Sequence, residues 1–384
     1  MSDANGLGVI RDLGVNGVPM LGLDTDVHAL GFSSRYAAGL VCPSPQDDEE
    51  AFLTFLEELG ARLPQRGVLF PTHDEYVWAL SRNAARLERY YHLPFSRWDV
   101  MQRLHDQRAQ LEAAWNAGVD TPQTIFIDTP DELEAAAREV PYPAVLKPVD
   151  SLAFKQRFQR HLLDVGSPDD LRRIYPSVAD LGTLMLQERV PGGDAELFSV
   201  GSYLDVRSRP LAVFTGHKIR QYPAGAGSAR LGVSRWDTEL ADAGLRLLVE
   251  LGYHGVSQVE FKRDARDGRY CLMEVNARHW MWHALSTACG VNLSLAAYRD
   301  AIGKPFLAPR QSDGLKWIVA TKDTPLAARE MWHRQLSPLE WARSLKGARV
   351  DGVLSLKDPV PGIKNVGRVA LQIARRRPST REEN

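Results

Sequence analysis

Amphipathic and apolar segments alternate along the first hundred residues in an order that predicts a parallel α/β layer. Helices over 6–14, 48–63 and 74–91 alternate with short apolar strands over 18–24 and 66–72. Helices that flank short apolar strands are typical of such a layer. Because the pattern begins in a helix where a strand ordinarily comes first, we expect either a missing first strand or a start that lies upstream.

The remaining chain changes from a mixed to a strand-rich pattern. The strands expected after residue 183 are joined by short turns, which favours a largely antiparallel sheet. We therefore predict an α/β fold with α+β lobes. Its parts are an N-terminal layer (1–103), a small lobe with a linker helix (104–190), a large lobe (191–305) and a helical extension with a basic tail (306–384).

The composition is that of an ordinary globular protein and excludes several classes. The 384 residues are 44% hydrophobic and 25% charged, and 47 Lys and Arg against 48 Asp and Glu give a net charge of -1. A dedicated nucleic-acid-binding protein would carry a basic excess. No apolar run approaches the roughly 18 residues of a membrane span. Three cysteines without a CxxC pair argue against disulfides and zinc, so we expect a cytoplasmic protein that binds neither nucleic acid nor membrane.

Residues 256–278 predict a β-hairpin with paired carboxylates. With the turn at 265–268, Glu260 lies opposite Glu274, and Asn276 shares their face. The other face would carry the apolar residues Val259, Phe261, Met273 and Val275. Opposed carboxylates destabilise a sheet unless a cation lies between them, and Mg²⁺ prefers oxygen ligands.

An alternative reading of this hairpin is a solvated polar face. In that case Glu260 would pair with Lys262 or Arg278, because polar faces are common on antiparallel sheets. The spacing alone leaves both readings open.

Three further segments offer groups that suit a nucleotide. Lys147 lies within the apolar run 142–149, where it either reaches water or meets an anion such as a phosphate. A strand that ends at Glu188 is followed by a Pro-Gly-Gly turn and then Glu196, a pattern that suits a purine and a ribose but also a simple hairpin. Lys218 and Arg220 are expected on one strand face before a Gly-rich loop that could close over an anion.

Taken in order, the phrases LKP, QERVPGG…E, HK, VEF and MEVNAR resemble the ATP-grasp superfamily. The resemblance is to its carboxylate–amine ligases related to carbamoyl-phosphate synthetase and D-aspartate ligase. It runs from about residue 6 to residue 305, and the N-terminal layer resembles the pre-ATP-grasp domain of the family.

The resemblance implies a role for each matching position. Lys147 would bind the α- and β-phosphates, Glu188 and the Arg189–Val190 backbone would contact the adenine, and Glu196 would hold the ribose. Lys218 would approach the triphosphate, and we expect Lys218, Arg220 and Arg278 to be the catalytic residues. Arg278 would stabilise the transferred phosphoryl group. The residues implied as ligands of Mg²⁺, or of Mn²⁺ in its place, are Glu260, Glu274 and Asn276.

Two departures from the family pattern stand out. A lysine common before the first helix of the small lobe is replaced here by Gln107, with Arg108 as a candidate substitute. The Gly-rich loop expected after LKP reads SLAFKQRFQR, in which Lys155 could replace the backbone amides or could be a surface residue.

The implied reaction is ATP-dependent joining of a carboxylate to an amine through an acyl phosphate, with ADP and phosphate as products. Its partners would be two small molecules, and a homodimer is left open. The alternatives are a phosphotransferase or carboxylase on the same fold, and an ATP-binding sensor without turnover. His279 and His283, expected on one face of a helix, would either contact substrate or metal or pack in the core.

Overall fold

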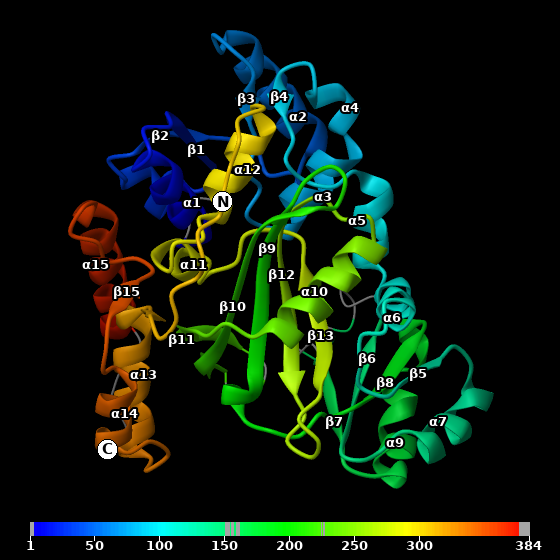
Figure 1. Cartoon of the computed structure of the whole chain (residues 1–384). Coiled ribbons are helices and arrows are strands. Elements are labelled where there is room, and N and C mark those ends of the chain that lie inside the picture. Colours follow the sequence, from blue (N-terminus) through cyan, green and yellow to red (C-terminus); the bar gives the residue numbers. More distant parts are fainter. Residues whose placement is uncertain are drawn as a thin grey trace, which may run out of the picture.

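The structure of the chain is a computed structural model that describes residues 4–149, 154, 157–158, 162–223, 225 and 227–375. Figure 1 shows an N-terminal layer, a small lobe and a large lobe built on a long central sheet. The mixed α/β and α+β fold expected from the sequence is confirmed. None of the helices in the described ranges combines the length and apolar character needed to cross a lipid bilayer.

The N-terminal layer alternates helices with short parallel strands, as predicted. Its elements are α1 (Ala4–Gly14), β1 (Met20–Asp24), η1 (Leu30–Ser33), β2 (Ala37–Val41), α2 (Glu49–Arg62), β3 (Gly67–Val68), α3 (Asp74–Arg82), α4 (Ala84–Leu87) and β4 (Tyr91–His92). The strands form two separate parallel pairs, β1 with β2 and β3 with β4. The single helix expected over 74–91 is divided at Asn83, which ends α3 and precedes α4.

Two consecutive helices, α5 (Trp98–His105) and α6 (Gln107–Asn116), lead from the layer to the small lobe. The Asp106 carboxylate accepts a hydrogen bond from the Arg108 N–H (2.9 Å) and so caps the start of α6. Ala113 and Ala114 of α6 pack in the core of the large lobe. The linker helix is therefore anchored on the large lobe.

The small lobe is a four-stranded antiparallel sheet in the order β5-β8-β6-β7. Its elements are β5 (Thr124–Ile127), η2 (Pro130–Glu132), α7 (Leu133–Glu139), β6 (Ala144–Pro148), β7 (Leu163–Val165), α9 (Pro168–Ile174), η3 (Tyr175–Ser177), η4 (Ala179–Leu181) and β8 (Leu184–Glu188). Leu146 and Leu186 pack in the apolar core shared with α7 and α9. Because side chains alternate along a strand, Lys147 lies on the other face of this sheet.

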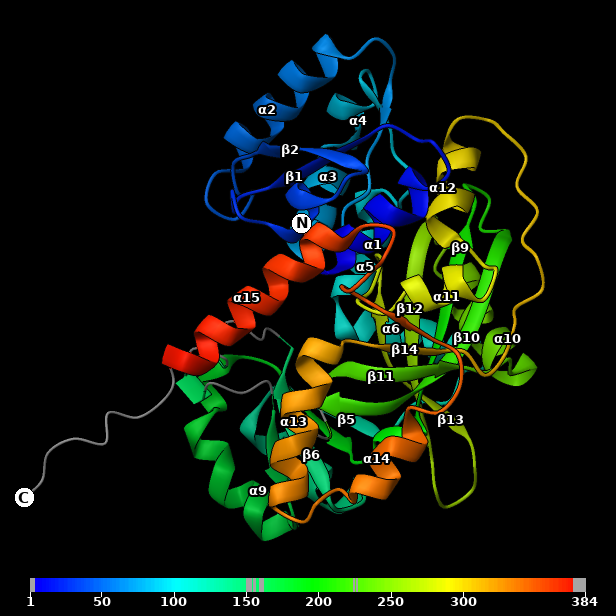
Figure 2. The ribbon, with the colours of Figure 1, turned by 90° about the vertical axis from the view of Figure 1, so that its left-hand side faces the viewer.

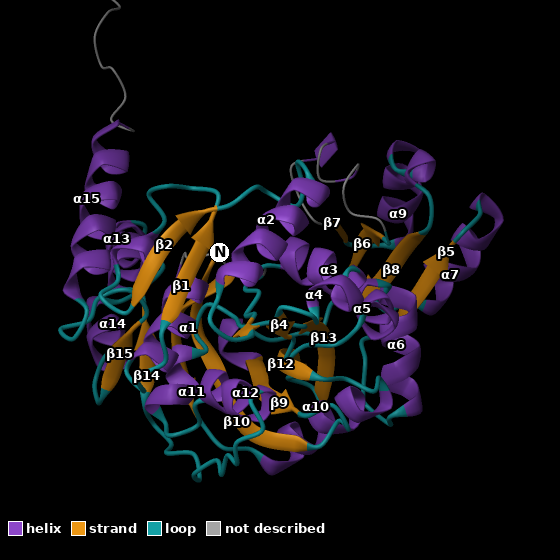
Figure 3. Ribbon diagram, turned by 90° about the horizontal axis from the view of Figure 1, so that it is seen from above, coloured by secondary structure: helices purple, strands orange, loops and turns teal. Residues whose placement is uncertain are grey.

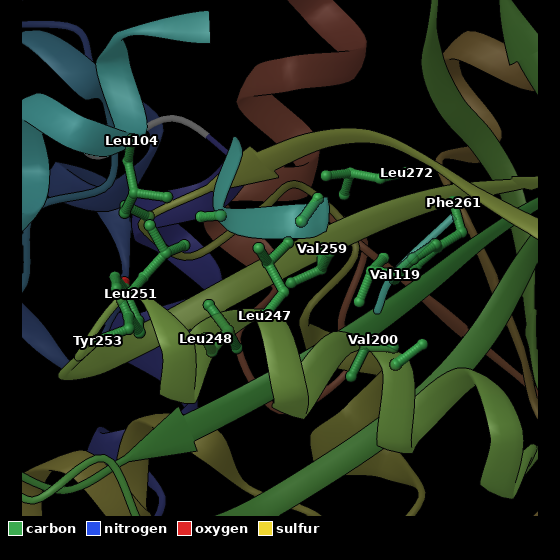
Figure 4. Close-up of a cluster of buried hydrophobic side chains, with 14 of the residues drawn as sticks. Leu104, Val119, Val200, Leu247, Leu248, Leu251, Tyr253, Val259, Phe261 and Leu272 are labelled. Atoms are coloured by element: carbon green, nitrogen blue, oxygen red, sulfur yellow. The ribbon is translucent and has the colours of Figure 1, made fainter. Parts of the chain in front are cut away.

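The large lobe has a seven-stranded sheet in the order β13-β12-β9-β10-β11-β14-β15. Residues 191–305 contribute η5 (Asp194–Glu196), β9 (Leu197–Leu204), β10 (Pro210–Tyr222), β11 (Ser228–Ser234), α10 (Thr238–Glu250), β12 (Gly255–Arg263), β13 (Tyr270–Asn276), α11 (Ala284–Ala288) and α12 (Leu293–Ala301). One face packs against α10, where Val200, Leu247 and Val259 belong to a cluster of buried side chains (Figure 4). The functional groups lie on the opposite face.

The C-terminal region contributes to the same sheet. The predicted extension is helical in α13 (Ala320–Trp332), α14 (Pro338–Ser344) and α15 (Pro359–Arg375), but it also holds β14 (Lys316–Ile318) and β15 (Arg349–Asp351). Figure 2 shows α13 and α14 beside β11, and α15 reaching towards the N-terminal layer. Buried Asp358 pairs there with Arg11 of α1 (3.0 Å) and accepts hydrogen bonds from Ser34 and Arg35. The helical description of 306–384 is therefore incomplete.

We expect Gly201→Ala to destabilise the large lobe. A Cβ at Gly201 in β9 would lie 2.1 Å from Cη2 of Trp280, a buried and rigid ring. Overpacking of this kind costs roughly 1–3 kcal/mol. Thermal unfolding should report a lower Tm for Gly201→Ala and an unchanged Tm for the matched variant Gly193→Ala, whose Cβ would meet no atom within 4 Å. Equal melting temperatures would contradict the packing.

Candidate active site

The β12–β13 hairpin brings two carboxylates face to face. Its register pairs Glu260 directly with Glu274 and Gln258 with Asn276, as the predicted turn requires. The backbone of the turn closes through a hydrogen bond from the Gly268 N–H to the Asp264 carbonyl (2.8 Å). The opposed pair expected from the sequence is therefore present.

The core face of this hairpin differs from the prediction in one residue. A β-bulge follows the Glu260–Glu274 pair, so that Phe261 lies opposite Leu272 rather than Met273. Leu272 is buried in the core, whereas Met273 is only partly buried and lies outside that cluster. Assigning Met273 to the core was wrong because a strict period of two does not hold across a bulge.

Glu260 is buried and held by two side chains. The Lys218 Nζ lies 3.0 Å from its Oε1. The Gln258 Nε2 donates to Oε1 at 2.8 Å. Burial raises the pKa of Glu260, the Lys218 ammonium opposes that effect, and the negative charge of Glu274 adds to it. Glu260 therefore pairs with Lys218 and not with Lys262 or Arg278, the partners of the alternative reading.

Glu274 and Asn276 add further side-chain oxygens beside Glu260. The Asn276 Nδ2 donates to Glu274 Oε1 at 2.9 Å, so the two side chains lie together on the exposed side of Glu260. Within the described part of the chain no three acidic, His or Cys side chains gather as a metal site. Two carboxylates and an amide suit Mg²⁺, which usually takes one or two carboxylates and completes its shell with water and phosphate oxygens.

Lys147 faces this set from the small lobe. Desolvation lowers the pKa of its ammonium to about 8, and the Glu274 carboxylate works against that decrease. Lys147 is therefore close enough to Glu274 for the two charges to interact, although no hydrogen bond or ion pair joins them among the described residues. Lys147, Lys218, Glu260 and Glu274 thus form one cluster, which we call the two-lobe charge cluster. Figure 3 shows the small lobe beside the β12–β13 end of the large sheet.

The residues expected to contact adenine and ribose lie at the end of β8 and in η5. Glu188 pairs with Arg266, and Arg189 pairs with Asp164. Neither the backbone hydrogen bonds nor the side-chain hydrogen bonds of the described residues use the Val190 N–H, which leaves that donor available.

Glu196, the residue implied for the ribose, is paired with Arg263 through Oε2 and Nε at 2.7 Å. The ion pair occupies the Glu196 carboxylate. A ribose that binds to Glu196 would either displace the Arg263 side chain or bind next to it. The predicted role of Glu196 stays a prediction.

Arg220 and Lys218 do not act on one face of β10. A β-bulge separates them, and Lys218 meets Glu260 whereas Arg220 forms a two-point ion pair with Asp323 of α13 at 3.0 and 2.9 Å. The expectation that Lys218 and Arg220 share one strand face is therefore wrong, and the catalytic role expected of Arg220 stays a prediction. Through this ion pair Arg220 holds α13 against the sheet.

Arg278 also has a carboxylate partner. Its Nε and Nη2 lie 2.8 and 3.0 Å from the Asp74 oxygens at the start of α3. The pair joins the N-terminal layer to the end of β13, two residues after Asn276. Arg278 is partly buried, and the role predicted for it stays a prediction.

We expect Asp323→Asn to destabilise the protein strongly. Asp323 is fully buried. Its carboxylate forms ion pairs with Arg220 and Arg230 and accepts a hydrogen bond from the Trp341 Nε1 (2.9 Å). Removing its charge leaves the buried Arg220 guanidinium without a carboxylate, which costs roughly 3–5 kcal/mol, whereas Arg230 keeps Glu330 as a partner. Urea unfolding should show this loss, whereas exposed Asp242→Asn should unfold like the parent chain. A small effect of Asp323→Asn would contradict the anchoring role of Arg220.

His279 and His283 are core residues. Both precede α11, which begins at Ala284, so the expected helix start at the histidines is wrong. His279 is buried, its Nε2 lies 3.0 Å from the Ser294 Oγ, and burial holds its pKa well below the usual value. His283 Nδ1 lies 2.7 Å from the Trp280 carbonyl. This packing excludes both rings from a substrate pocket and supports the core alternative.

Gln258 was not singled out from the sequence, and Lys262 was named only as a possible partner of Glu260. Gln258 and Lys262 lie two positions before and after Glu260 on β12 and share its face. Desolvation lowers the pKa of Lys262, and the nearby positive charge of Arg189 adds to that effect. The period of two that located Glu260 could have located both.

Two departures from the family pattern have different outcomes. Lys155 and most of SLAFKQRFQR lie outside the described residues. Arg108, the candidate substitute for the missing lysine, binds Asp128 at 2.9 Å and lies over the Phe126 ring. It is therefore engaged within the small lobe.

Comparison with known proteins agrees with this geometry. A sequence profile for the ATP-binding domain of the carbamoyl-phosphate synthase L chain matches residues 226–308, which include Glu260 and Glu274. The D-aspartate ligase of Enterococcus faecium is 22% identical over 326 residues, which cover 75% of this chain and 77% of that protein.

Two solved structures share the fold. The N5-carboxyaminoimidazole synthetase of Staphylococcus aureus, solved with ADP, gives a TM-score of 0.63 at 14% identity and covers 87% of this chain and 84% of that chain. The biotin carboxylase domain of the Hydrogenobacter thermophilus 2-oxoglutarate carboxylase was solved with MgADP and bicarbonate. It gives a TM-score of 0.62 at 17% identity, and the match covers 80% of this chain and 70% of that chain. The fold expected from the sequence is thereby confirmed.

Proposed function

We propose that this ATP-grasp chain is an ATP-dependent ligase that joins a small-molecule carboxylate to an amine. The observation that carries the proposal is the two-lobe charge cluster. Two ammonium groups, Lys147 and Lys218, face two carboxylates, Glu260 and Glu274, where the lobes meet. Such a set can hold a triphosphate and its metal together, and phosphoryl transfer depends on positioning and charge neutralisation.

The nucleotide would lie between the lobes. Lys147 would contact its phosphates from β6, while Lys218 approaches from β10. The free Val190 N–H after β8 would serve the adenine edge. The relatives support this assignment, since two solved structures of the same fold contain ADP.

Glu260, Glu274 and Asn276 would hold Mg²⁺, with Mn²⁺ as a substitute. The fit rests on the donor set, because the two carboxylates are directly opposed and, among the residues that the structure describes, Lys218 is the one cation hydrogen-bonded to either. The metal would neutralise charge on the phosphate oxygens. The residues of the chain would fix the position of those oxygens.

In the proposed reaction a substrate carboxylate oxygen attacks the γ-phosphorus and ADP leaves. The amine nitrogen then attacks the acyl carbon, the C–N bond forms, phosphate leaves, and the amine gives up a proton. Lys147 and Lys218 would stabilise the phosphates during the first step. Arg278, held by Asp74 beside the hairpin, would stabilise the acyl phosphate.

A carboxylase is the second candidate, because a structure of the same fold was solved with bicarbonate. In that case bicarbonate replaces the organic acid and the product is an N- or C-carboxylate. The two candidates differ in the acid that enters the product.

The test is mass spectrometry of the purified protein with Mg-ATP and pooled acids and amines, beside a reaction with bicarbonate and the amines alone. A product equal to acid plus amine minus water, formed with stoichiometric ADP, supports the ligase. A product heavier than the amine by CO₂ supports the carboxylase. ATP binding without ADP release in any pool contradicts both and favours a sensor.

A further inference from the structure

The helix α15 exposes a row of apolar side chains, which we call the apolar stripe. Its members Val360, Ile363, Val366 and Leu371 are 46%, 68%, 47% and 60% exposed. With about 100° per residue, these four positions fall within an arc of roughly 140° and so lie on one side of the helix. A contiguous apolar surface of this kind marks an interaction site, unlike single apolar residues scattered over a surface.

The opposite side of α15 is held on the body of the protein. Gly362 is buried there, and the Asn365 Nδ2 donates to the Thr321 Oγ1 of α13 (2.9 Å). The Arg368 side chain donates to the His28 carbonyl of the N-terminal layer. These contacts fix the rotation of α15, which lies along the edge of the molecule in Figures 1 and 2. The apolar stripe therefore faces solvent.

The chain that leads into α15 widens the apolar surface. Leu356 is fully exposed. A shallow hollow joins this turn to the stripe, with about 730 Å³ of empty space including the part open to solvent, and it is lined by Leu354, Ser355, Leu356, Pro359, Ile363 and Val366. All of these residues except Ser355 are apolar, so a partner that fills the hollow gains by removing them from water.

The same region is basic, although the whole chain has a net charge of -1. The basic residues of 357–377 are Lys357, Lys364, Arg368, Arg375, Arg376 and Arg377. The acidic residue of this stretch is Asp358, which is buried and paired with Arg11. Arg368 is compensated in part by Asp26 at 3.8 Å, whereas Lys357 and Lys364 are exposed. A partner with complementary chemistry offers negative charge beside an apolar layer.

A second copy of the chain would match the apolar stripe but not its charge. It would bring the same cations, and the sequence from 357 to 377 holds no acidic residue other than the buried Asp358 to pair with them. A bilayer with anionic headgroups supplies both the negative charge and the apolar layer. Basic amphipathic helices bind such surfaces in the plane of the bilayer, and each Lys or Arg near the headgroups strengthens the attachment.

We propose that α15 binds the surface of an anionic lipid bilayer. The apolar stripe would enter the boundary between headgroups and acyl chains, and Lys357 and Lys364 would lie at the headgroups. The expectation from the sequence that the protein binds no membrane rests on the length of its apolar runs. That length decides whether a segment can span a bilayer, and a helix on the surface needs no such run. The inference is independent of the proposed function.

Co-sedimentation of the full chain with vesicles tests the proposal. We expect binding to vesicles of phosphatidylcholine and phosphatidylglycerol in equal parts, little binding to phosphatidylcholine alone, and weaker binding at high salt. Ile363→Asp combined with Leu371→Asp should lower the partition coefficient at least about tenfold. Val206→Asp, at an exposed apolar residue after β9, is the matched control and should bind like the parent chain. Unchanged binding of the double variant overturns the proposal.

A charge variant that leaves the apolar stripe intact provides the second test. Lys364→Glu should lower binding to the phosphatidylglycerol vesicles at least about fivefold, while Lys304→Glu, at an exposed lysine after α12, should lower it much less. An unchanged Tm shows that each variant is folded. Absence of binding to either kind of vesicle overturns the proposal, and a dimer in sedimentation velocity that Ile363→Asp dissociates would then assign the stripe to a second copy.

Discussion

Glu274→Gln should lower ATP-dependent product formation at least about a hundredfold while leaving the fold intact. The carboxylate lies opposite Glu260 and beside Asn276 on an exposed surface, so its charge serves a bound cation rather than packing. Glutamine keeps the shape but removes one of the two carboxylates proposed for the metal. Substitutions at exposed positions ordinarily change stability by less than about 0.5 kcal/mol.

The measurement is ADP release at saturating Mg-ATP with the substrate pair found by mass spectrometry. Thermal unfolding of the same preparation shows that the variant is folded. Glu250→Gln, an exposed carboxylate at the end of α10, is the matched control and should keep full activity. Full activity of Glu274→Gln would remove this residue from the metal site.

Lys147→Met should weaken ATP binding at least about tenfold, because hydrogen bonds to charged groups contribute roughly 1.5–3 kcal/mol. The ammonium is also expected to give ATP binding a pH dependence. Desolvation lowers the pKa of Lys147 to about 8 in the free protein, so the positive charge is present below that pH and is lost as the pH rises through it. Affinity for ATP should therefore decline above about pH 8.

Titration of ATP by calorimetry between pH 6.5 and 9.5 measures this profile. Lys147→Arg should flatten it, since a guanidinium stays charged throughout the range, although its planar shape should reduce affinity at neutral pH. Lys304→Met, at an exposed lysine after α12, should reproduce the parent profile. A decline above pH 8 that persists in Lys147→Arg would assign the titration to another group.

Much of the fold and the centre of the site could be predicted from the sequence because they depend on local periodicity. Alternation along two strands and a short turn placed Glu260 opposite Glu274, and an apolar run placed Lys147 on a strand. These features require only the geometry of a strand and the order of its residues.

What could not be predicted depends on contacts between distant segments. The partner of Arg220 is Asp323, which lies more than a hundred residues later, so no local sequence pattern predicts that ion pair. The bulges beside Lys218 and Glu260 changed which residues share a face, as Leu272 in place of Met273 illustrates. For the two histidines the sequence left a functional role and core packing open, because their contacts with α1 and α12 are visible only in three dimensions.

The contacts of Asp358 have a consequence for the order of events during synthesis. Its partners Arg11, Ser34 and Arg35 leave the ribosome more than three hundred residues earlier. The two strands β14 and β15 at the edge of the large sheet also come late. Native pairings between such distant segments form slowly because a long loop must close first. The last native contacts of the N-terminal layer therefore form only after residue 358 has been synthesised.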